Sequence, residues 1–117
     1  MYLVDERSVP PNDPESNYGM MKAHLLDFVP IPTEQIFRIR GEENPDQEAK
    51  RYSKLVYDSL PKTKEGHPQF DLILLGAGDD GHTSSIFPGQ EDLLKSPDLY
   101  APSVNPNTQQ KRIALTG

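Results

Sequence analysis

The chain has 117 residues, no cysteine, 34% hydrophobic residues and a formal net charge of −6 from 18 acidic and 12 basic side chains. The acidic balance argues against nucleic acid as a partner, because proteins bind nucleic acid largely by neutralising its phosphates with Lys and Arg. The lack of cysteine excludes disulfides and cysteine-based metal sites, and since no apolar stretch has the length of a signal peptide or a membrane span, we expect a cytoplasmic protein with no membrane partner.

The first half of the chain predicts a strand, a helix, a second strand and a second helix. The apolar run at residues 2–4 favours a strand, and apolar residues at helical spacing predict a helix over 16–29 that prolines terminate. Residues 36–40 are rich in β-formers and predict the second strand. Helical spacing returns between Pro45 and Pro61, where we expect the second helix.

The most apolar stretch of the chain, residues 70–75, predicts a strand buried on both faces. Beyond it the pattern favours a short helical turn at 85–87 and strands at 100–104 and 112–115. The order strand, helix, strand, helix, strand predicts an α/β fold with a Rossmann-like parallel sheet, right-handed crossovers and helices on both faces. Because parallel strands end at one edge of a sheet, the loops after residues 4 and 75 should open side by side, where ligands bind in open α/β folds.

The loop that follows this buried strand has glycines at the spacing of a dinucleotide-binding fingerprint. They are Gly76, Gly78 and Gly81. Two features oppose a nucleotide site. Pro88 leaves room for only about two turns of helix at the pyrophosphate position, and the two aspartates at positions 79 and 80 place negative charge there. A nucleotide-binding module stays an alternative interpretation of this loop.

The same loop carries side chains suited to hydrolysis. His82 can take a proton from water near neutral pH, and Asp80 is the natural carboxylate to orient its ring. Thr83 and Ser84 offer hydroxyls or backbone amides near a helix start, where an oxyanion or a phosphate oxygen is bound well. The plainer alternative is that His82 is a loop histidine satisfied by local hydrogen bonds.

A second polar group follows the first strand. Arg7 is the best anion ligand in the chain, because a guanidinium binds phosphate through two parallel hydrogen bonds, and Asp5 would face the same opening and orient a sugar hydroxyl. The alternative is a surface cluster in which Arg7 pairs with its acidic neighbours. No metal site is expected, since the three histidines of the chain are far apart and lack the paired spacing of a zinc site.

Several segments together resemble the 6-phosphogluconolactonase family, in the family's order and along the whole chain. They are Asp5-Glu6-Arg7-Ser8-Val9-Pro10, Ser16-Asn17, Phe70-Asp71-Leu72-Ile73-Leu74-Leu75-Gly76 and, most specific, Asp80-Gly81-His82-Thr83-Ser84-Ser85-Ile86-Phe87-Pro88-Gly89, with weaker matches at Ala49, Tyr52 and residues 112–116. The related glucosamine-6-phosphate isomerases and deaminases carry a tyrosine in place of Arg7 and an Asn-Glu-Pro sequence after the Gly-His pair. This chain has Ser85-Ile86-Phe87-Pro88 there, so both differences favour the lactonase.

The resemblance implies hydrolysis of 6-phospho-D-glucono-1,5-lactone to 6-phosphogluconate, a step of the oxidative pentose phosphate pathway, without a metal or organic cofactor. His82 would be the general base on water, with Asp80 orienting it. Arg7 would hold the phosphate or a sugar oxygen, and Asp5 matches an acidic position of the same site. The remaining substrate-binding candidates are Gly78, Gly81, Thr83 and Ser84.

The sequence departs from the family at two single positions and lacks two of the family's segments. Ser84 and Ala114 stand where alanine and threonine are usual. The family begins before the first motif with a glycine- and serine-rich phosphate loop and continues to a substrate-binding lysine, so we expect residues 1–117 to form a single partial domain. The alternatives to the lactonase are a deaminase or isomerase of the same fold and a non-catalytic part of that fold. An unfinished sheet exposes unpaired backbone, through which the chain could aggregate or form a homo-oligomer.

Overall fold

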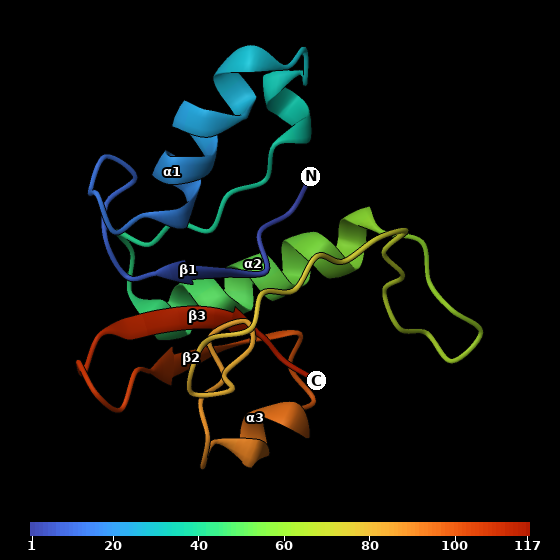
Figure 1. Ribbon diagram of the computed structural model, residues 1–117. Coiled ribbons are helices and arrows are strands. Elements are labelled where there is room, and N and C mark those ends of the chain that lie inside the picture. The colour runs from blue at the N-terminus through green and yellow to red at the C-terminus, as the bar shows by residue number, and fades with distance from the viewer.

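Three α-helices and three short β-strands form the regular structure of residues 1–117, all of which the computed structural model describes, in an α/β arrangement (Figure 1). The helices are α1 (Asn17–His24), α2 (Pro45–Ser59) and α3 (Glu91–Leu94), and the strands are β1 (Asp5–Arg7), β2 (Tyr100–Val104) and β3 (Lys111–Leu115). Two 3₁₀ turns, Leu26–Phe28 and Thr33–Gln35, lie between α1 and α2. No helix is both long enough and apolar enough to cross a membrane.

The three strands form an antiparallel sheet in the order β1-β3-β2, with β3 at its centre. The two strands predicted near the end of the chain are confirmed as β2 and β3. Between β1 and β3, Asp5 lies opposite Ala114 and Arg7 lies opposite Arg112. Because side chains directly opposite each other in an antiparallel pair share a face, this register brings Arg7 and Arg112 together.

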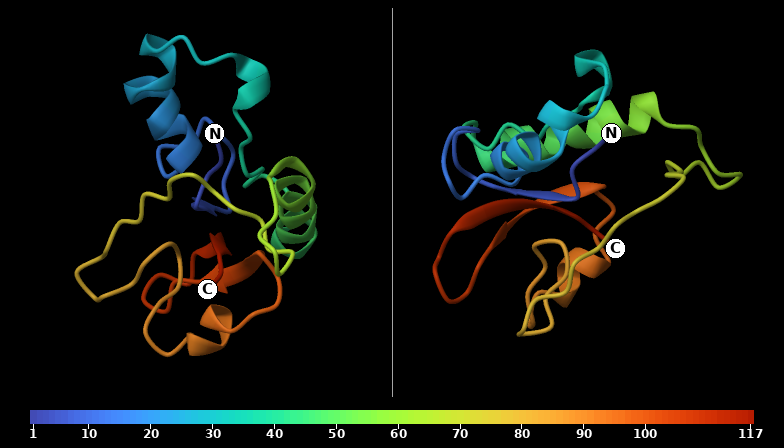
Figure 2. Two further views of the ribbon diagram at one scale, coloured as in Figure 1. Left: turned by 90° about the vertical axis from the view of Figure 1, so that its right-hand side faces the viewer. Right: turned by 45° about the horizontal axis from the view of Figure 1, so that its top comes forward.

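The second helix, α2, packs against β2 and β3 and covers one face of the sheet (Figures 1 and 2). The start of α2 has two features that are typical of a helix N-terminus. The Asn44 side chain accepts hydrogen bonds from the backbone N–H groups of Asp46 at 3.1 Å and Gln47 at 3.2 Å, and Pro45 takes the first helical position. The helix predicted between the two prolines is therefore confirmed, and it ends at Ser59.

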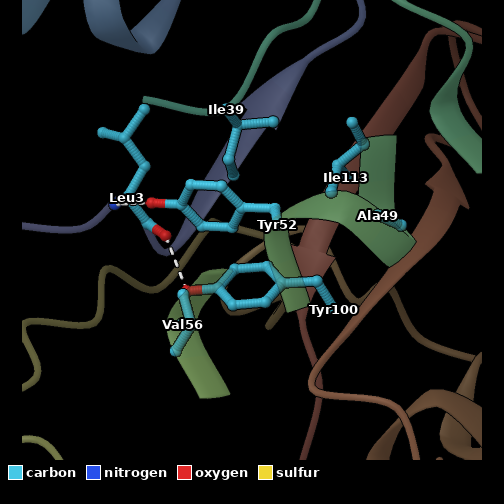
Figure 3. Packing of buried hydrophobic residues seen from close by; sticks show 7 residues of the cluster. All are labelled: Leu3, Ile39, Ala49, Tyr52, Val56, Tyr100 and Ile113. Atoms are coloured by element: carbon cyan, nitrogen blue, oxygen red, sulfur yellow. Dashed lines mark hydrogen bonds between the residues drawn. The ribbon is translucent and has the colours of Figure 1, made fainter. Parts of the chain in front are cut away.

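The core lies between α2 and the sheet (Figure 3) and consists of seven buried residues: Leu3, Ile39, Ala49, Tyr52, Val56, Tyr100 and Ile113. The Tyr52 and Tyr100 rings meet edge to face, with centroids 4.8 Å apart. Tyr52 Oη accepts a hydrogen bond from Leu3 N at 2.9 Å and donates to Phe37 O at 2.6 Å, while Tyr100 Oη donates to Leu3 O at 2.9 Å. Burial raises the pKa of both phenols, so they stay protonated and anchor the segment that leads into β1.

The first helix is shorter than the sequence predicts. Ser16 caps its start by accepting a hydrogen bond from Gly19 N at 3.0 Å, but α1 ends at His24, so the helix predicted over 16–29 is wrong beyond that residue. The chain continues as the 3₁₀ turn, in which Phe28 is 77% exposed. Because short helices depend on packing of their apolar face, a face without a partner does not support further turns.

The predicted parallel sheet is reduced in this chain to one bridge. Tyr2 and Phe37 form a single parallel bridge in place of the strands predicted at 2–4 and 36–40, and their rings stack with centroids 4.8 Å apart. Every strand pair that the structure contains is antiparallel.

Residues 70–75, predicted as a strand buried on both faces, are not a strand. They run over the surface without a backbone hydrogen bond, with Leu72 74% and Leu74 78% exposed. A central parallel strand needs a ladder on each side, and none of the three strands pairs with this segment. The segment is apolar, but apolar composition does not supply the neighbouring strands that burial of a strand requires.

Candidate active site

A polar cavity of about 250 Å³ lies where the start of β1, the loop at 74–84 and β3 meet. Its polar and charged lining residues are Asp5, Arg7, Asn17, His82, Ser84 and Arg112. Residues 5–7, expected in a loop after the first strand, form strand β1 itself, and they meet the loop after residue 75 at this cavity although the sheet is antiparallel. A larger hollow of about 750 Å³ lies nearby, but 14 of its 17 lining residues are hydrophobic, so the chemistry belongs to the smaller cavity.

His82 and Asp80 form a hydrogen-bonded pair in the loop. His82 Nδ1 lies 2.5 Å from Asp80 Oδ1, and His82 N donates to the same oxygen at 3.1 Å. These two hydrogen bonds, the backbone one first, lower the pKa of the Asp80 carboxyl below its ordinary value. An ionised Asp80 holds the proton of the ring on Nδ1, which leaves Nε2 as the acceptor. Asp80 itself does not line the cavity, so it contributes to the chemistry there only by orienting the His82 ring.

Two glycines shape the turn that presents His82. A Cβ atom at Gly78 would lie 2.1 Å from Cε1 and 2.2 Å from Nδ1 of the His82 ring, so only glycine leaves space for the imidazole. Gly81 has a φ of 84°, in the left-handed region that favours glycine, and its N–H donates to Gly78 O at 2.9 Å. Gly78 lines the cavity, and Gly81 serves the turn alone.

The hydroxyl residues after His82 do not start a helix. Residues 85–87, predicted as a helical turn, are not helical: Ser85 lies in a tight turn closed by Thr83 and Ile86, Phe87 follows that turn, and α3 begins only at Glu91. The dinucleotide interpretation therefore lacks the helix that would face a pyrophosphate. Thr83 Oγ1 donates to Gly76 O at 3.0 Å and does not reach the cavity, whereas Ser84 lines it.

Asp5 is held deep in the cavity wall by two neutral partners. Ser85 Oγ donates to its Oδ2 at 2.6 Å, and Asn17 Nδ2 lies 3.2 Å from its Oδ1. Burial raises the pKa of the Asp5 carboxyl, against the lowering effects of the Ser85 hydrogen bond and of Arg7 and Arg112. Asp5 is thus positioned to accept a hydrogen bond from a ligand hydroxyl.

Arg7 does not pair with its acidic neighbours, so the surface-cluster interpretation is wrong. Its Nη1 donates to Asn17 Oδ1 and, at 3.1 Å, to Glu15 O, and its buried Nε has no partner. Glu6 is 1% exposed and turned away, accepting hydrogen bonds from Ser16 Oγ and the first N–H groups of α1. Arg7 therefore keeps its positive charge free for an anion in the cavity.

Sequence reasoning missed three residues of this site. Asn17 enters the sequence analysis only through the Ser16-Asn17 match, yet its side chain bridges Asp5 and Arg7. Ser85 stands in the specific motif, but nothing marked it as a partner of Asp5. Arg112 was noted only as part of a weak match, because its place opposite Arg7 depends on an antiparallel register that the sequence did not reveal. No cluster of three or more metal-binding side chains is present.

Comparisons with known proteins assign the chain to a family and support its fold. The family model of glucosamine-6-phosphate isomerases/6-phosphogluconolactonase matches residues 1–117, and the chain belongs to that family. The 6-phosphogluconolactonase of Treponema pallidum (strain Nichols) is 42% identical over 116 residues, which cover 99% of this chain and 48% of the relative.

Solved structures show the same likeness. The devB protein matches with a TM-score of 0.91 and 43% identity, and the match covers 97% of this chain and 47% of the devB chain. The 6-phosphogluconolactonase from Trypanosoma brucei has a TM-score of 0.83 and 30% identity, covering 98% of this chain and 51% of its own. The chain thus spans about half the length of the relatives it matches.

Proposed function

We propose that this protein hydrolyses 6-phospho-D-glucono-1,5-lactone to 6-phosphogluconate in the oxidative pentose phosphate pathway. One observation carries the proposal: His82 Nδ1 lies 2.5 Å from Asp80 Oδ1 while the ring lines a cavity that also holds two arginines. The lactonase names of relatives such as that of Treponema pallidum, 42% identical, support the same reaction.

In this mechanism His82 Nε2 takes a proton from a water molecule, whose oxygen attacks the lactone carbonyl carbon. The tetrahedral intermediate then collapses, the bond from that carbon to the ring oxygen breaks, and the imidazolium returns its proton to the leaving oxygen. Asp80 stabilises the imidazolium between these steps. General acid–base assistance of this kind supplies about 10²–10⁴-fold, so correct positioning of the lactone must contribute the rest.

The other residues of the cavity would hold the sugar. Arg7 binds the phosphate or a sugar oxygen, Asp5 accepts a hydrogen bond from a sugar hydroxyl, and Ser84 offers its hydroxyl from the cavity wall. Gly78 leaves room for the His82 ring, while Gly81 and Thr83 support the loop without facing the cavity.

A deaminase or isomerase of the same family is the second candidate, and the residues after His82 count against it. Ring-opening chemistry in that branch uses the glutamate of an Asn-Glu-Pro sequence after the Gly-His pair, whereas this chain has Ser85-Ile86-Phe87-Pro88, which contains no carboxylate. A non-catalytic role is the third candidate, because the chain spans about half of its relatives.

One experiment separates these functions by their products. The chain is incubated with 6-phosphogluconolactone and, separately, with glucosamine 6-phosphate, and 6-phosphogluconate and ammonia are measured against the spontaneous rates. We expect 6-phosphogluconate alone. Ammonia release would establish the deaminase, and neither product would leave the non-catalytic role.

We further propose that the segments around residues 2–4, 36–40 and 70–75 would form a Rossmann-like parallel sheet if neighbouring strands paired with them; in this structure only the Tyr2–Phe37 bridge is formed. The parallel Tyr2–Phe37 bridge supports the pairing of the first two, and the edge-to-face contact of Tyr2 with Phe70, at 5.8 Å between centroids, supports placing the third beside them. Homo-oligomer formation and a cytoplasmic location stay predictions from the sequence.

A further inference from the structure

Two arginines stand directly opposite each other at the edge of the active-site cavity. Arg7 of β1 pairs with Arg112 of β3 in the antiparallel ladder, and both side chains line the cavity. Like charges directly opposite each other across two strands are destabilising. Such a pair is expected where an anion binds between the two guanidinium groups.

Neutral groups, and not a carboxylate, hold Arg112 in place. Its Nε donates to Gln110 Oε1 at 3.2 Å, its Nη1 donates to Ser85 Oγ at 3.4 Å, and its guanidinium carbon lies 5.3 Å from the centroid of the Phe87 ring. Arg112 is 8% exposed and forms no salt bridge. The protein therefore buries this charge at the cavity, orients it, and leaves it without a direct ion pair.

The two arginines outnumber the carboxylates that face them. Asp5, on the same face of the sheet, supplies one negative charge, and each of its oxygens accepts a hydrogen bond from a neutral partner, Ser85 or Asn17. Asp80 is committed to His82. With Asp5 ionised, the arginine pair and Asp5 together carry one positive charge, which suits an anionic group of a ligand.

The position of Arg112 relative to His82 indicates which end of the ligand it meets. The His82 ring and the Arg112 guanidinium both pack on Phe87, with the His82 centroid 4.7 Å from the ring centroid. Both also line the one cavity of about 250 Å³. A group bound by the arginine pair therefore lies beside the general base, where the carbon that reacts must be.

We propose that Arg112, together with Arg7, binds the oxygens of the reacting carbon: the lactone carbonyl in the substrate and the carboxylate in the product. This inference rests on the proposed lactonase function and selects a sugar oxygen, not the phosphate, as the ligand of Arg7. A guanidinium matches a carboxylate through two parallel hydrogen bonds, and donors aimed at an oxygen that gains negative charge stabilise the transition state.

Two ligands that differ only at this carbon test the proposal. 6-Phosphogluconate carries the carboxylate, whereas D-glucitol 6-phosphate has a hydroxymethyl group in its place and keeps the phosphate. In calorimetric titrations the chain should bind 6-phosphogluconate more tightly by roughly ten- to a hundredfold, as expected for charge-assisted hydrogen bonds. Arg112→Gln should remove most of this preference and leave the affinity for D-glucitol 6-phosphate unchanged.

Two further variants test whether Arg112→Gln changes the affinities only because it disturbs the fold. Arg112→Lys keeps the charge but not the planar fork, and should retain part of the preference while keeping the fold. Arg40→Gln removes an exposed arginine outside the cavity and should change neither affinity.

Three results would overturn the inference: no preference in the unmodified chain, a preference that survives Arg112→Gln, or an equal loss of affinity for both ligands, which would assign Arg112 to the phosphate. Because these are binding measurements, their failure is distinct from a failure to detect turnover, which would contradict the proposed function instead.

Discussion

At the scale of single residues, the cavity depends on one glycine beside the general base. A side chain at Gly78 would overlap the His82 ring, which has nowhere to move without losing Asp80. We predict that Gly78→Ala displaces the imidazole and lowers the hydrolysis rate by about a hundredfold or more, the size of a lost general base. The NMR resonances of the His82 ring report its displacement, and kcat reports the change in hydrolysis rate.

Gly76→Ala is the matched control for this substitution, because a Cβ there would meet no atom within 4 Å. It should leave the His82 resonances in place. Unchanged resonances and rate in Gly78→Ala would contradict the role of this glycine.

The partly buried Asp5 carboxyl lowers the free energy of unfolding when it is ionised. Burial raises its pKa above the ordinary 3.8, so the folded protein binds the Asp5 proton at a higher pH than the unfolded chain does. The Asp5 contribution to the free energy of unfolding therefore falls as pH rises from about 3.8 through the raised pKa. We predict that Asp5→Asn removes this component in urea unfolding measured over that window. The exposed Asp92→Asn serves as the control, and a variant with the unchanged pH dependence would contradict the prediction.

At the scale of elements, Glu6 joins β1 to the start of α1. Its buried carboxylate accepts hydrogen bonds from Ser16 Oγ at 3.0 Å, Asn17 N at 2.7 Å and Tyr18 N at 2.9 Å. This bond set also fixes Asn17, whose side chain then holds Asp5 and Arg7. The site is thus assembled by the contact between a strand and a helix terminus.

We predict that Glu6→Gln lowers the free energy of unfolding by about 1–3 kcal/mol, because an amide leaves part of this bond set unsatisfied. Activity should fall with it as Asn17 shifts. Denaturant unfolding measures the change, and the exposed Glu34→Gln should have little effect. A Glu6→Gln chain as stable as the parent would show that the carboxylate is replaceable.

The elements also show what sequence could and could not predict. Local signals suffice for α2, whose apolar spacing between two prolines predicts it, and for β2 and β3. They fail for residues 70–75, because burial of a strand depends on neighbours that local pattern does not encode. In the site, the motif predicts the pairing of His82 with Asp80, which are two residues apart. Arg112 lies far along the chain from the motif and enters only through strand register.

At the scale of the whole molecule, an apolar groove of about 750 Å³ stands beside the polar cavity. It is lined by the chain start, α1 and the segment 70–74, where Leu72 and Leu74 are mostly exposed. Exposed apolar patches of this kind bind hydrophobic probes and promote association.

We predict that the chain enhances the fluorescence of the dye anilinonaphthalene sulfonate, and that the double variant Leu72→Ser with Leu74→Ser lowers the enhancement severalfold. Self-association in sedimentation should fall in parallel. Leu94→Ser removes a leucine that is 47% exposed outside the groove and should change little. If Leu94→Ser lowered the fluorescence as much as the double variant does, the dye would bind outside the groove.

The proposed lactonase function is tested most directly by hydrolysis of 6-phosphogluconolactone by the chain and by His82→Ala, with the spontaneous rate subtracted. We predict turnover by the unmodified chain and a loss of about 10²–10⁴-fold in the variant, while replacement of the exposed His67, outside the cavity, by alanine keeps the parent rate. No turnover above the spontaneous rate, or a His82→Ala chain as active as its parent, would contradict it.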